Sequence, residues 1–149
     1  MKVTFCGHRS IENVDEVKEW LRDVVKTLIL SGADTFYLGG YGAFDRIAAA
    51  VIQENKHQHP QITSVLVLAY LNQKTESVYD STLYPPLENV PMRFAIPKRN
   101  QWMVDQSEVI VAYVQYRWGG ASATLDYAMR KGKKVIQYTK DYEQQPHRL

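Results

Sequence analysis

The sequence contains only one cysteine, Cys6, so no disulfide can form within the chain, which fits a reducing compartment. It has no apolar run long enough to cross a bilayer, and its first residues turn polar too soon for a secretory signal peptide. We therefore expect a soluble protein of the cytoplasm that has no membrane partner.

A large excess of charge of one sign is also missing. The 18 Lys and Arg residues against 16 Asp and Glu residues leave a net charge of +2, too small for a surface that coats nucleic acid. The densest basic cluster, residues 130–134, falls where a helix is expected to end, and cations there stabilise the helix dipole. We therefore do not expect a nucleic-acid partner.

The well-known nucleotide and metal motifs are absent. The sequence has no G-x-x-x-x-G-K-[ST] loop, no H-E-x-x-H and no C-x-x-C, so a P-loop enzyme and a zinc site have no support. Residues 40–45 share two glycines with the dinucleotide fingerprint G-x-G-x-x-G, but they follow the second strand and end in aspartate. We expect no metal, and we identify no cofactor beyond a nucleotide-like ligand.

What the chain does have is an alternation of strand and helix patterns. The 149 residues suffice for one core but not for two, so we expect a single domain over residues 1–149. Strands are predicted over 2–6, 35–38, 62–70, 92–96, 109–114 and 134–138, and helices over 14–29, 44–52, 99–106 and 120–131. This order predicts an α/β, Rossmann-like three-layer sandwich: a mostly parallel sheet with helices on both faces. The polar, proline-containing segment 71–91 is expected to be either a lid or a loosely packed loop.

Glycine-rich turns follow three of the predicted strands. Their glycines are Gly7 after the first strand, Gly39, Gly40 and Gly42 after the second, and Gly119 and Gly120 after the fifth. In open parallel sheets, ligands bind outside the carboxyl ends of the strands, and each of these turns leads into a helix N-terminus that attracts anions. The three turns together predict a cradle for phosphate or another anion.

Several side chains near these turns are further candidates. Arg9 and Arg99 could each clamp a phosphate, and His8 belongs to the first turn. Asp45 would either stabilise a helix N-terminus or accept hydrogen bonds from a ribose, and Asn100 would either hold a base or sugar or cap a short helix. A strand-end tyrosine could stack on a base. The predicted ligand-binding set is therefore Gly7, His8, Arg9, Gly39, Gly40, Gly42, Asp45, Arg99, Asn100, Gly119 and Gly120.

The order of these motifs resembles a known superfamily. The sequences F-C-G-H-R at 5–9, G-G-Y-G-A-F-D at 39–45, R-N at 99–100 with Met103, and G-G at 119–120 are similar to the SLOG (Smf/DprA–LOG) superfamily, and to its small bacterial YpsA-like branch. The resemblance covers residues 3 to about 138. It implies a Rossmann-like fold with a nucleotide-related pocket formed by the same turns.

The resemblance implies three activities. LOG-type members cleave a nucleoside monophosphate between base and ribose 5-phosphate, DprA-type members bind single-stranded DNA, and other SLOG domains sense nucleotide-derived signals. The LOG motif P-G-G-x-G-T-x-x-E is not intact here, because residues 118–127 lack its proline, contain an extra residue and place Tyr127 where the catalytic glutamate would fall. Asp126 is the nearest carboxylate, so the catalytic candidates are Asp45, Arg99 and Asp126.

The sequence leaves three functions open. The first is binding or sensing of a nucleotide or nucleotide-derived ligand at the glycine-rich turns, the second is a nucleotide N-glycosidase, and the third is a regulator that binds a protein partner. Whether the protein is an enzyme, and whether it forms a homo-oligomer, stays open at this point. For every function that requires a bound ligand, Arg9→Ala and Gly40→Val are expected to abolish binding and to leave the fold intact.

Overall fold

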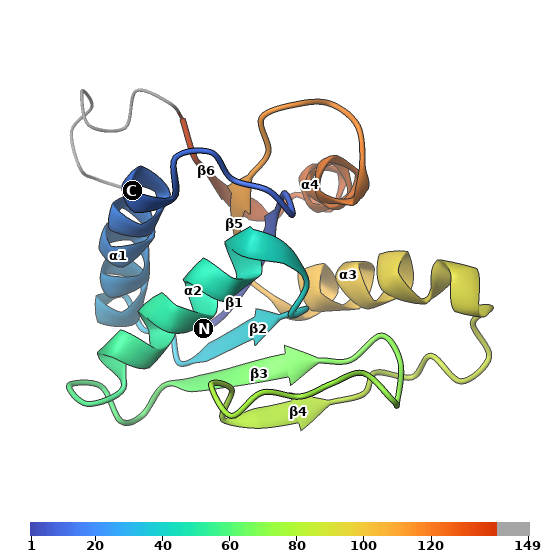
Figure 1. Cartoon of the computed structure of the whole chain (residues 1–149), viewed down its shortest axis with the longest axis horizontal. Coiled ribbons are helices and arrows are strands. Elements are labelled where there is room, and N and C mark those ends of the chain that lie inside the picture. Colours follow the sequence, from blue (N-terminus) through green and yellow to red (C-terminus); the bar gives the residue numbers. More distant parts are fainter. Residues whose placement is uncertain (140–149) are drawn as a thin grey trace.

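The computed structural model describes residues 1–139 and contains one six-stranded sheet, in the order β4-β3-β2-β1-β5-β6 (Figure 1). Every neighbouring pair of strands is parallel. The strands are β1 (Lys2–Gly7), β2 (Thr35–Leu38), β3 (Thr63–Val67), β4 (Ser81–Leu83), β5 (Val109–Tyr113) and β6 (Lys134–Gln137).

Four α-helices cover the two faces of this sheet. α1 (Val14–Leu30) packs against α2 (Gly42–Asn55), and α3 (Ala95–Gln106) packs against α4 (Gly120–Arg130) (Figure 1). The protein is thus an α/β, Rossmann-like three-layer sandwich, as the alternation of strand and helix patterns predicts.

The central strand β1 is buried on both faces. Val3 and Phe5 join the larger apolar core, which includes α1 and α2, whereas Cys6 joins a second core with Val104 of α3 and Ala128 of α4. Because successive side chains of a strand point to opposite faces, a strand covered on both sides needs an unbroken apolar run. The sequence V-T-F-C of residues 3–6 comes close to such a run, and its one polar member, Thr4, donates its hydroxyl hydrogen to the Tyr37 carbonyl at 3.0 Å.

The strand order creates a crevice at one edge of the sheet. From β1 the chain builds outward through β2, β3 and β4, and it then returns to place β5 on the other side of β1. The turns after β1 and β5 therefore leave the sheet in opposite directions, and such a switch point is the usual ligand site of open α/β sheets. α3 immediately precedes β5, so its first turns also lie at the carboxyl edge.

Two segments differ from the sequence prediction. The strand predicted over 92–96 is wrong: Met92–Phe94 is a 3₁₀ turn, and α3 begins at Ala95. Pro97 lies in the first turn of α3, where a missing backbone N–H costs no helical hydrogen bond. The sequence analysis also missed β4, a three-residue edge strand inside the segment 71–91.

Candidate functional site

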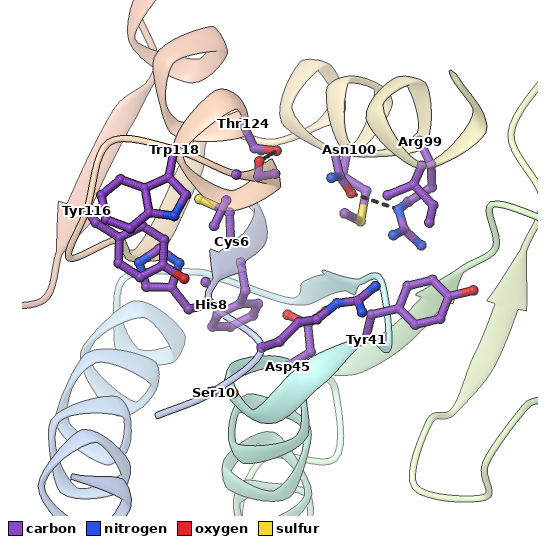
Figure 2. A pocket seen from close by; sticks show the side chains of 18 residues that line it. Cys6, His8, Ser10, Tyr41, Asp45, Arg99, Asn100, Tyr116, Trp118 and Thr124 are labelled. Carbon is purple, nitrogen blue, oxygen red and sulfur yellow. Dashed lines mark hydrogen bonds between the residues drawn. The ribbon is translucent and has the colours of Figure 1, made fainter. Parts of the chain in front are cut away.

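A cavity of about 320 Å³ opens at the switch point between β1 and β5 (Figure 2). Its wall is formed by residues 5–10 of β1 and the turn after it, by the start of α2, by one side of α3, and by residues 116–124 of the β5–α4 turn and α4. The sheet edge, two helix N-terminal regions and α3 thus enclose one space, and this is the candidate site.

The β5–α4 turn presents backbone to this cavity. Gly119, Gly120 and Ala121 line it, and α4 begins there without a side-chain cap. Gly119 has φ of +91°, a left-handed backbone that favours glycine, whereas φ of Gly120 lies outside the left-handed region. A Cβ built on Gly120 would meet no atom of the described residues within 4 Å. Neither backbone geometry nor packing explains the glycine at 120. The uncapped N–H groups and the helix dipole make this end of α4 suited to an anion.

The β1 turn brings a cation to the same cavity. The carbonyl of Arg9 accepts the backbone N–H of Ala43 at 2.8 Å, which ties the turn to the start of α2. The Arg9 side chain is exposed and lines the cavity, and within residues 1–139 its guanidinium makes no hydrogen bond or ion pair. Arg9 is therefore a cation available to a ligand.

Asp45 is a buried carboxyl group in the first turn of α2. It is 9% exposed, it lines the cavity, and it accepts hydrogen bonds from the backbone N–H groups of Gly39, Gly40 and Tyr41. Burial raises the pKa of Asp45 to about 6, although the nearby Arg99 and these three backbone donors oppose the rise. Asp45 can therefore exchange a proton near neutral pH, whereas an exposed aspartate stays ionised.

Arg99 is held inside the protein by α3. It is 2% exposed, and its Nη1 donates to the carbonyls of Gly39 at 3.1 Å and Val67 at 2.9 Å, while its Nε donates to Asn100 Oδ1 at 2.8 Å. Burial lowers the pKa of Arg99, and the field of Asp45 opposes that shift. Arg99 thus fixes the β2 turn and the amide of Asn100, whose NH₂ group is left to face the cavity it lines.

Aromatic rings form the opposite end of the cavity. His8, Tyr116 and Trp118 lie on one side of it in Figure 2, and all three line it. The thiol of Cys6 also lines the cavity, but burial and the field of Asp45 raise the pKa of Cys6 to about 12, so the thiol stays protonated. A thiolate nucleophile is therefore not part of this site.

The structure brings most of the predicted residues together and separates the rest. Those that line the cavity are Gly7, His8, Arg9, Asp45, Arg99, Asn100, Gly119 and Gly120. Gly39, Gly40 and Gly42 do not line it, because the β2 turn folds around Asp45 and Arg99 instead. Asp126 is exposed on α4 and lines a neighbouring hollow with Gln115 and Arg117.

One expectation needs correction, and one stays open. Gly40 has φ of +79°, and a Cβ there would lie 2.6 Å from Leu66 Cδ1, so Gly40→Val would strain the fold and is not a clean test of binding. The segment 71–91 contributes no residue to the cavity lining. Its strand β4 pairs with β3, and Gln73 donates to the Gly39 carbonyl of the β2 turn at 3.2 Å. That the segment closes over a ligand stays a prediction.

Sequence reasoning missed Trp118 and Tyr41 as cavity residues. Trp118 directly precedes the Gly119–Gly120 pair, and a large exposed aromatic side chain next to a strand-end glycine turn was the available signal. Among residues 1–139, no group of three or more His, Cys, Asp or Glu side chains is placed to hold a metal ion. Within the same range, no helix has both the length and the apolar character that crossing a membrane requires.

Comparison with known proteins identifies the fold. No family model matches the chain, and no curated protein matches its sequence. Among solved structures, the structural-genomics target TM1055 aligns over 90% of this chain and 71% of its own, with a TM-score of 0.64 and 18% identity. DNA processing protein A (DprA) from Helicobacter pylori, described with its single-stranded DNA binding mode, aligns over 92% of this chain with a TM-score of 0.65 and 18% identity.

The molybdenum cofactor carrier protein of Chlamydomonas reinhardtii is a third structural neighbour. It aligns over 96% of this chain and 79% of its own, with a TM-score of 0.61 and 16% identity. The chain spans only 49% and 64% of the two DprA structures that it matches. These likenesses establish the architecture, and we conclude that the chain has the Rossmann-like fold that these structures share, in agreement with the fold that the motif order predicts.

Proposed function

We propose that this protein binds or senses a nucleotide or nucleotide-derived ligand in the cavity at the β1–β5 switch point. One observation carries the proposal: a single cavity joins the uncapped N-terminus of α4, the guanidinium of Arg9, which has no partner among residues 1–139, and the polar groups of Asp45 and Asn100. This combination suits a molecule with an anionic group at one point and hydroxyl groups at another.

The parts of such a ligand match different residues. A phosphate fits the backbone N–H groups of Gly119 and Gly120 together with Arg9, because both supply donors and positive charge. Ribose hydroxyls fit the Asp45 carboxyl, which accepts hydrogen bonds, and the Asn100 amide, which donates them. Arg99 acts from behind by orienting Asn100.

The structural neighbours support ligand binding in general. One is described as a carrier of the molybdenum cofactor and another by its binding of single-stranded DNA, so both printed functions are binding functions. The DNA-binding neighbour keeps nucleic acid among the ligands to be tested, although the net charge of +2 favours a small molecule. Together with the bacterial resemblance, the single cysteine favours action in the cytoplasm.

A thermal-shift panel tests the proposal. The purified protein is heated with mononucleotides, ADP-ribose, NAD, cyclic dinucleotides and a short single-stranded DNA. A compound present at about 100 times its dissociation constant adds about 2.7 kcal/mol to the stability of the native state, which is a readily measured shift. If no compound shifts the midpoint, small-ligand binding is contradicted and regulation by a protein partner becomes the better explanation.

The variant Arg9→Ala tests whether the ligand binds in this cavity. Arg9 is exposed, and its guanidinium has no partner in the described part of the chain. Its loss should therefore leave the melting temperature of the free protein unchanged and should abolish the ligand-induced shift. Arg46→Ala is the matched control, because Arg46 is an exposed arginine next to Asp45 that does not line the cavity. Equal losses in both variants would mean that net charge, and not this cavity, determines binding.

One observation favours a second function, nucleotide N-glycosidase. The carboxyl group of Asp45 faces the cavity with a pKa raised to about 6, as a group needs if it is to take a proton from water near neutral pH. Water would add to the anomeric carbon, the C–N bond would break, and the base would leave with a proton. Release of free base from any compound that binds, lost in Asp45→Asn, would establish it; binding without turnover would exclude it.

A further inference from the structure

Three aromatic rings are stacked at one end of the cavity. The imidazole of His8 lies face to face with the ring of Tyr116, with centroids 3.7 Å apart and planes 5° apart. Tyr116 in turn stacks on Trp118, with centroids 4.2 Å apart and planes 26° apart. The rings come from two turns, His8 from the one after β1 and the other two from the one after β5, and Figure 2 shows them together.

The inner end of this stack is fixed. Nε2 of His8 accepts the backbone N–H of Gln115 at 2.8 Å, and the ring packs edge-on against Tyr113 with centroids 5.8 Å apart. Because Nε2 accepts a hydrogen bond, the neutral imidazole carries its proton on Nδ1. The burial of His8 also lowers its pKa and so favours this neutral form. His8 is thus an uncharged first ring that is held by a hydrogen bond and a ring contact.

The outer end of the stack is open. Tyr116 is 38% exposed and Trp118 is 70% exposed, although burial of an aromatic ring of this size stabilises a protein. Trp118 also directly precedes the α4 N-terminus, where the phosphate is proposed to bind. A flat, exposed ring next to an anion site, supported from behind by two other rings, is the arrangement that receives a planar aromatic ligand group.

We propose that the exposed ring of Trp118 is the stacking surface for the heteroaromatic base of the ligand. This inference rests on the proposed function and sharpens it, because it selects compounds that contain a base over sugar phosphates, free phosphate and acyclic anions. Stacking tolerates any base, since every base has a flat face. Choice among bases would therefore depend on hydrogen bonds from other groups, and the stack itself selects only for compounds that contain a base.

The test compares two kinds of probe, nucleotides and ribose 5-phosphate, on three proteins. Dissociation constants for AMP, GMP, CMP and UMP are measured with the wild type, Trp118→Ala and Trp118→Phe, and ribose 5-phosphate is used to displace the tightest of the four. Loss of stacking should weaken the nucleotide about 10-fold in Trp118→Ala, and Trp118→Phe should stay within about 3-fold of the wild type. The inhibition constant of ribose 5-phosphate should change less than about 2-fold, because that probe has no base.

Tryptophan fluorescence gives a second measurement on the same samples. The other tryptophans lie outside the cavity lining, with Trp20 against Tyr138 and Trp102 against Tyr37. Binding of the nucleotide should therefore quench emission in the wild type and not in Trp118→Phe. Because Trp118 is mostly exposed, neither variant should lower the melting temperature of the free protein by more than about 2 °C.

The outcomes separate the two proposals. If nucleotides bind and Trp118→Ala either binds them normally or loses both probes equally, the stacking surface is overturned and the binding function stands. If neither the four nucleotides nor ribose 5-phosphate binds the wild type, the stacking proposal fails, and the thermal-shift panel with ADP-ribose, NAD and cyclic dinucleotides decides the binding function. If only the nucleotides bind, the difference between Trp118→Ala and Trp118→Phe decides: equal affinities overturn the proposal.

Discussion

The turns after β2 and after β5 both contain a glycine pair before a helix, yet they are physically unlike. In the β2 turn, a Cβ at Gly39 would lie 2.8 Å from Arg99 Cζ and one at Gly40 would lie 2.6 Å from Leu66 Cδ1, so the space is filled. In the β5 turn, a Cβ at either Gly119 or Gly120 would meet no atom within 4 Å. One turn is closed by the protein itself, and the other is open to the cavity.

The comparison teaches that a glycine-rich turn has two separate uses. The backbone donors of the closed turn are already occupied by the carboxyl group of Asp45, so this turn positions groups and offers no cradle of its own. The donors of the open turn have no side-chain cap and remain available. An anion site requires free donors, and glycine content alone does not reveal whether they are free.

The largest expected effect is a loss of stability when a glycine of the closed turn is replaced by a larger residue. Gly42 has φ of +88°, and a Cβ there would lie 2.7 Å from the Cα of Arg9, a backbone atom that cannot move aside. Gly42→Ala should therefore lower the free energy of unfolding by about 2–4 kcal/mol, through the left-handed backbone and the close contact. Urea denaturation measures this loss.

Gly120→Ala is the matched control for that change. It adds the same methyl group at the start of a helix, but into open space and at an ordinary φ, so its free energy of unfolding should stay within about 0.5 kcal/mol of the wild type. Equal losses in the two variants would mean that the turns do not differ in the way described.

A second effect is the pH dependence that Asp45 gives to the closed turn. Its folded-state pKa of about 6 lies above the ordinary value of 3.8, so the folded protein binds the proton more tightly than the unfolded chain does. The stability associated with protonated Asp45 is thus present below about pH 4 and is lost as the pH rises through 6, a change of roughly 3 kcal/mol at most. Asp45→Asn removes this dependence.

The measurement is the difference in unfolding free energy between the wild type and Asp45→Asn from pH 4 to pH 8. Carboxyl groups with lowered pKa values, such as Glu54 and Asp80, give the opposite slope, but they are common to both proteins and cancel in the difference. The wild type should lose stability relative to the variant up to about pH 6 and then run parallel to it. A flat difference would show that Asp45 has an ordinary pKa.

The third effect concerns the affinity of the ligand for the open turn after β5. In Gly120→Val the new Cβ meets no atom of residues 1–139 within 4 Å, so the free protein should melt as the wild type does. The ligand identified by the thermal-shift panel should bind at least about 10-fold more weakly. Calorimetric titration checks this value. An unchanged dissociation constant would show that the ligand does not approach the α4 N-terminus.

Much of this architecture could be predicted from the sequence, because apolar periodicity reports burial directly. The strand predicted over 62–70 contains the apolar run Val65–Leu68, and β3 lies there. The edge strand β4 could not be predicted, since only three residues, Ser81–Leu83, pair on one side and bury little. The assignment of 92–96 to a strand was wrong because so short a segment has too little periodicity to distinguish a strand from a helix start, and its last two residues open α3.

The location of the candidate site was predictable, but its internal roles were not. Strand-end turns must gather at one edge of a parallel sheet, so the closeness of Gly7 and Gly120 follows from topology. Asn100 reaches the same edge from α3, and the strand that was predicted before it is absent from the structure. Which donors are free depends on side-chain orientation. Arg99 was expected to clamp a phosphate, yet its guanidinium binds the carbonyls of Gly39 and Val67 inside the protein, and no sequence pattern reports that choice.

The smallest expected effect distinguishes two carboxylates that the sequence left equivalent. Asp126 is exposed on α4 and lines the neighbouring hollow, whereas Asp45 lines the cavity itself. Asp126→Asn should therefore change the affinity for the ligand less than about 2-fold, since an exposed charge outside the site is screened by water and salt. Any base release should be equally unaffected, while Asp45→Asn abolishes it.

The two variants are compared in one assay at the same ionic strength. If Asp126→Asn were the one that removed turnover, the reacting sugar would have to lie on the Asp126 side of Tyr116, and the catalytic cavity would be the neighbouring hollow.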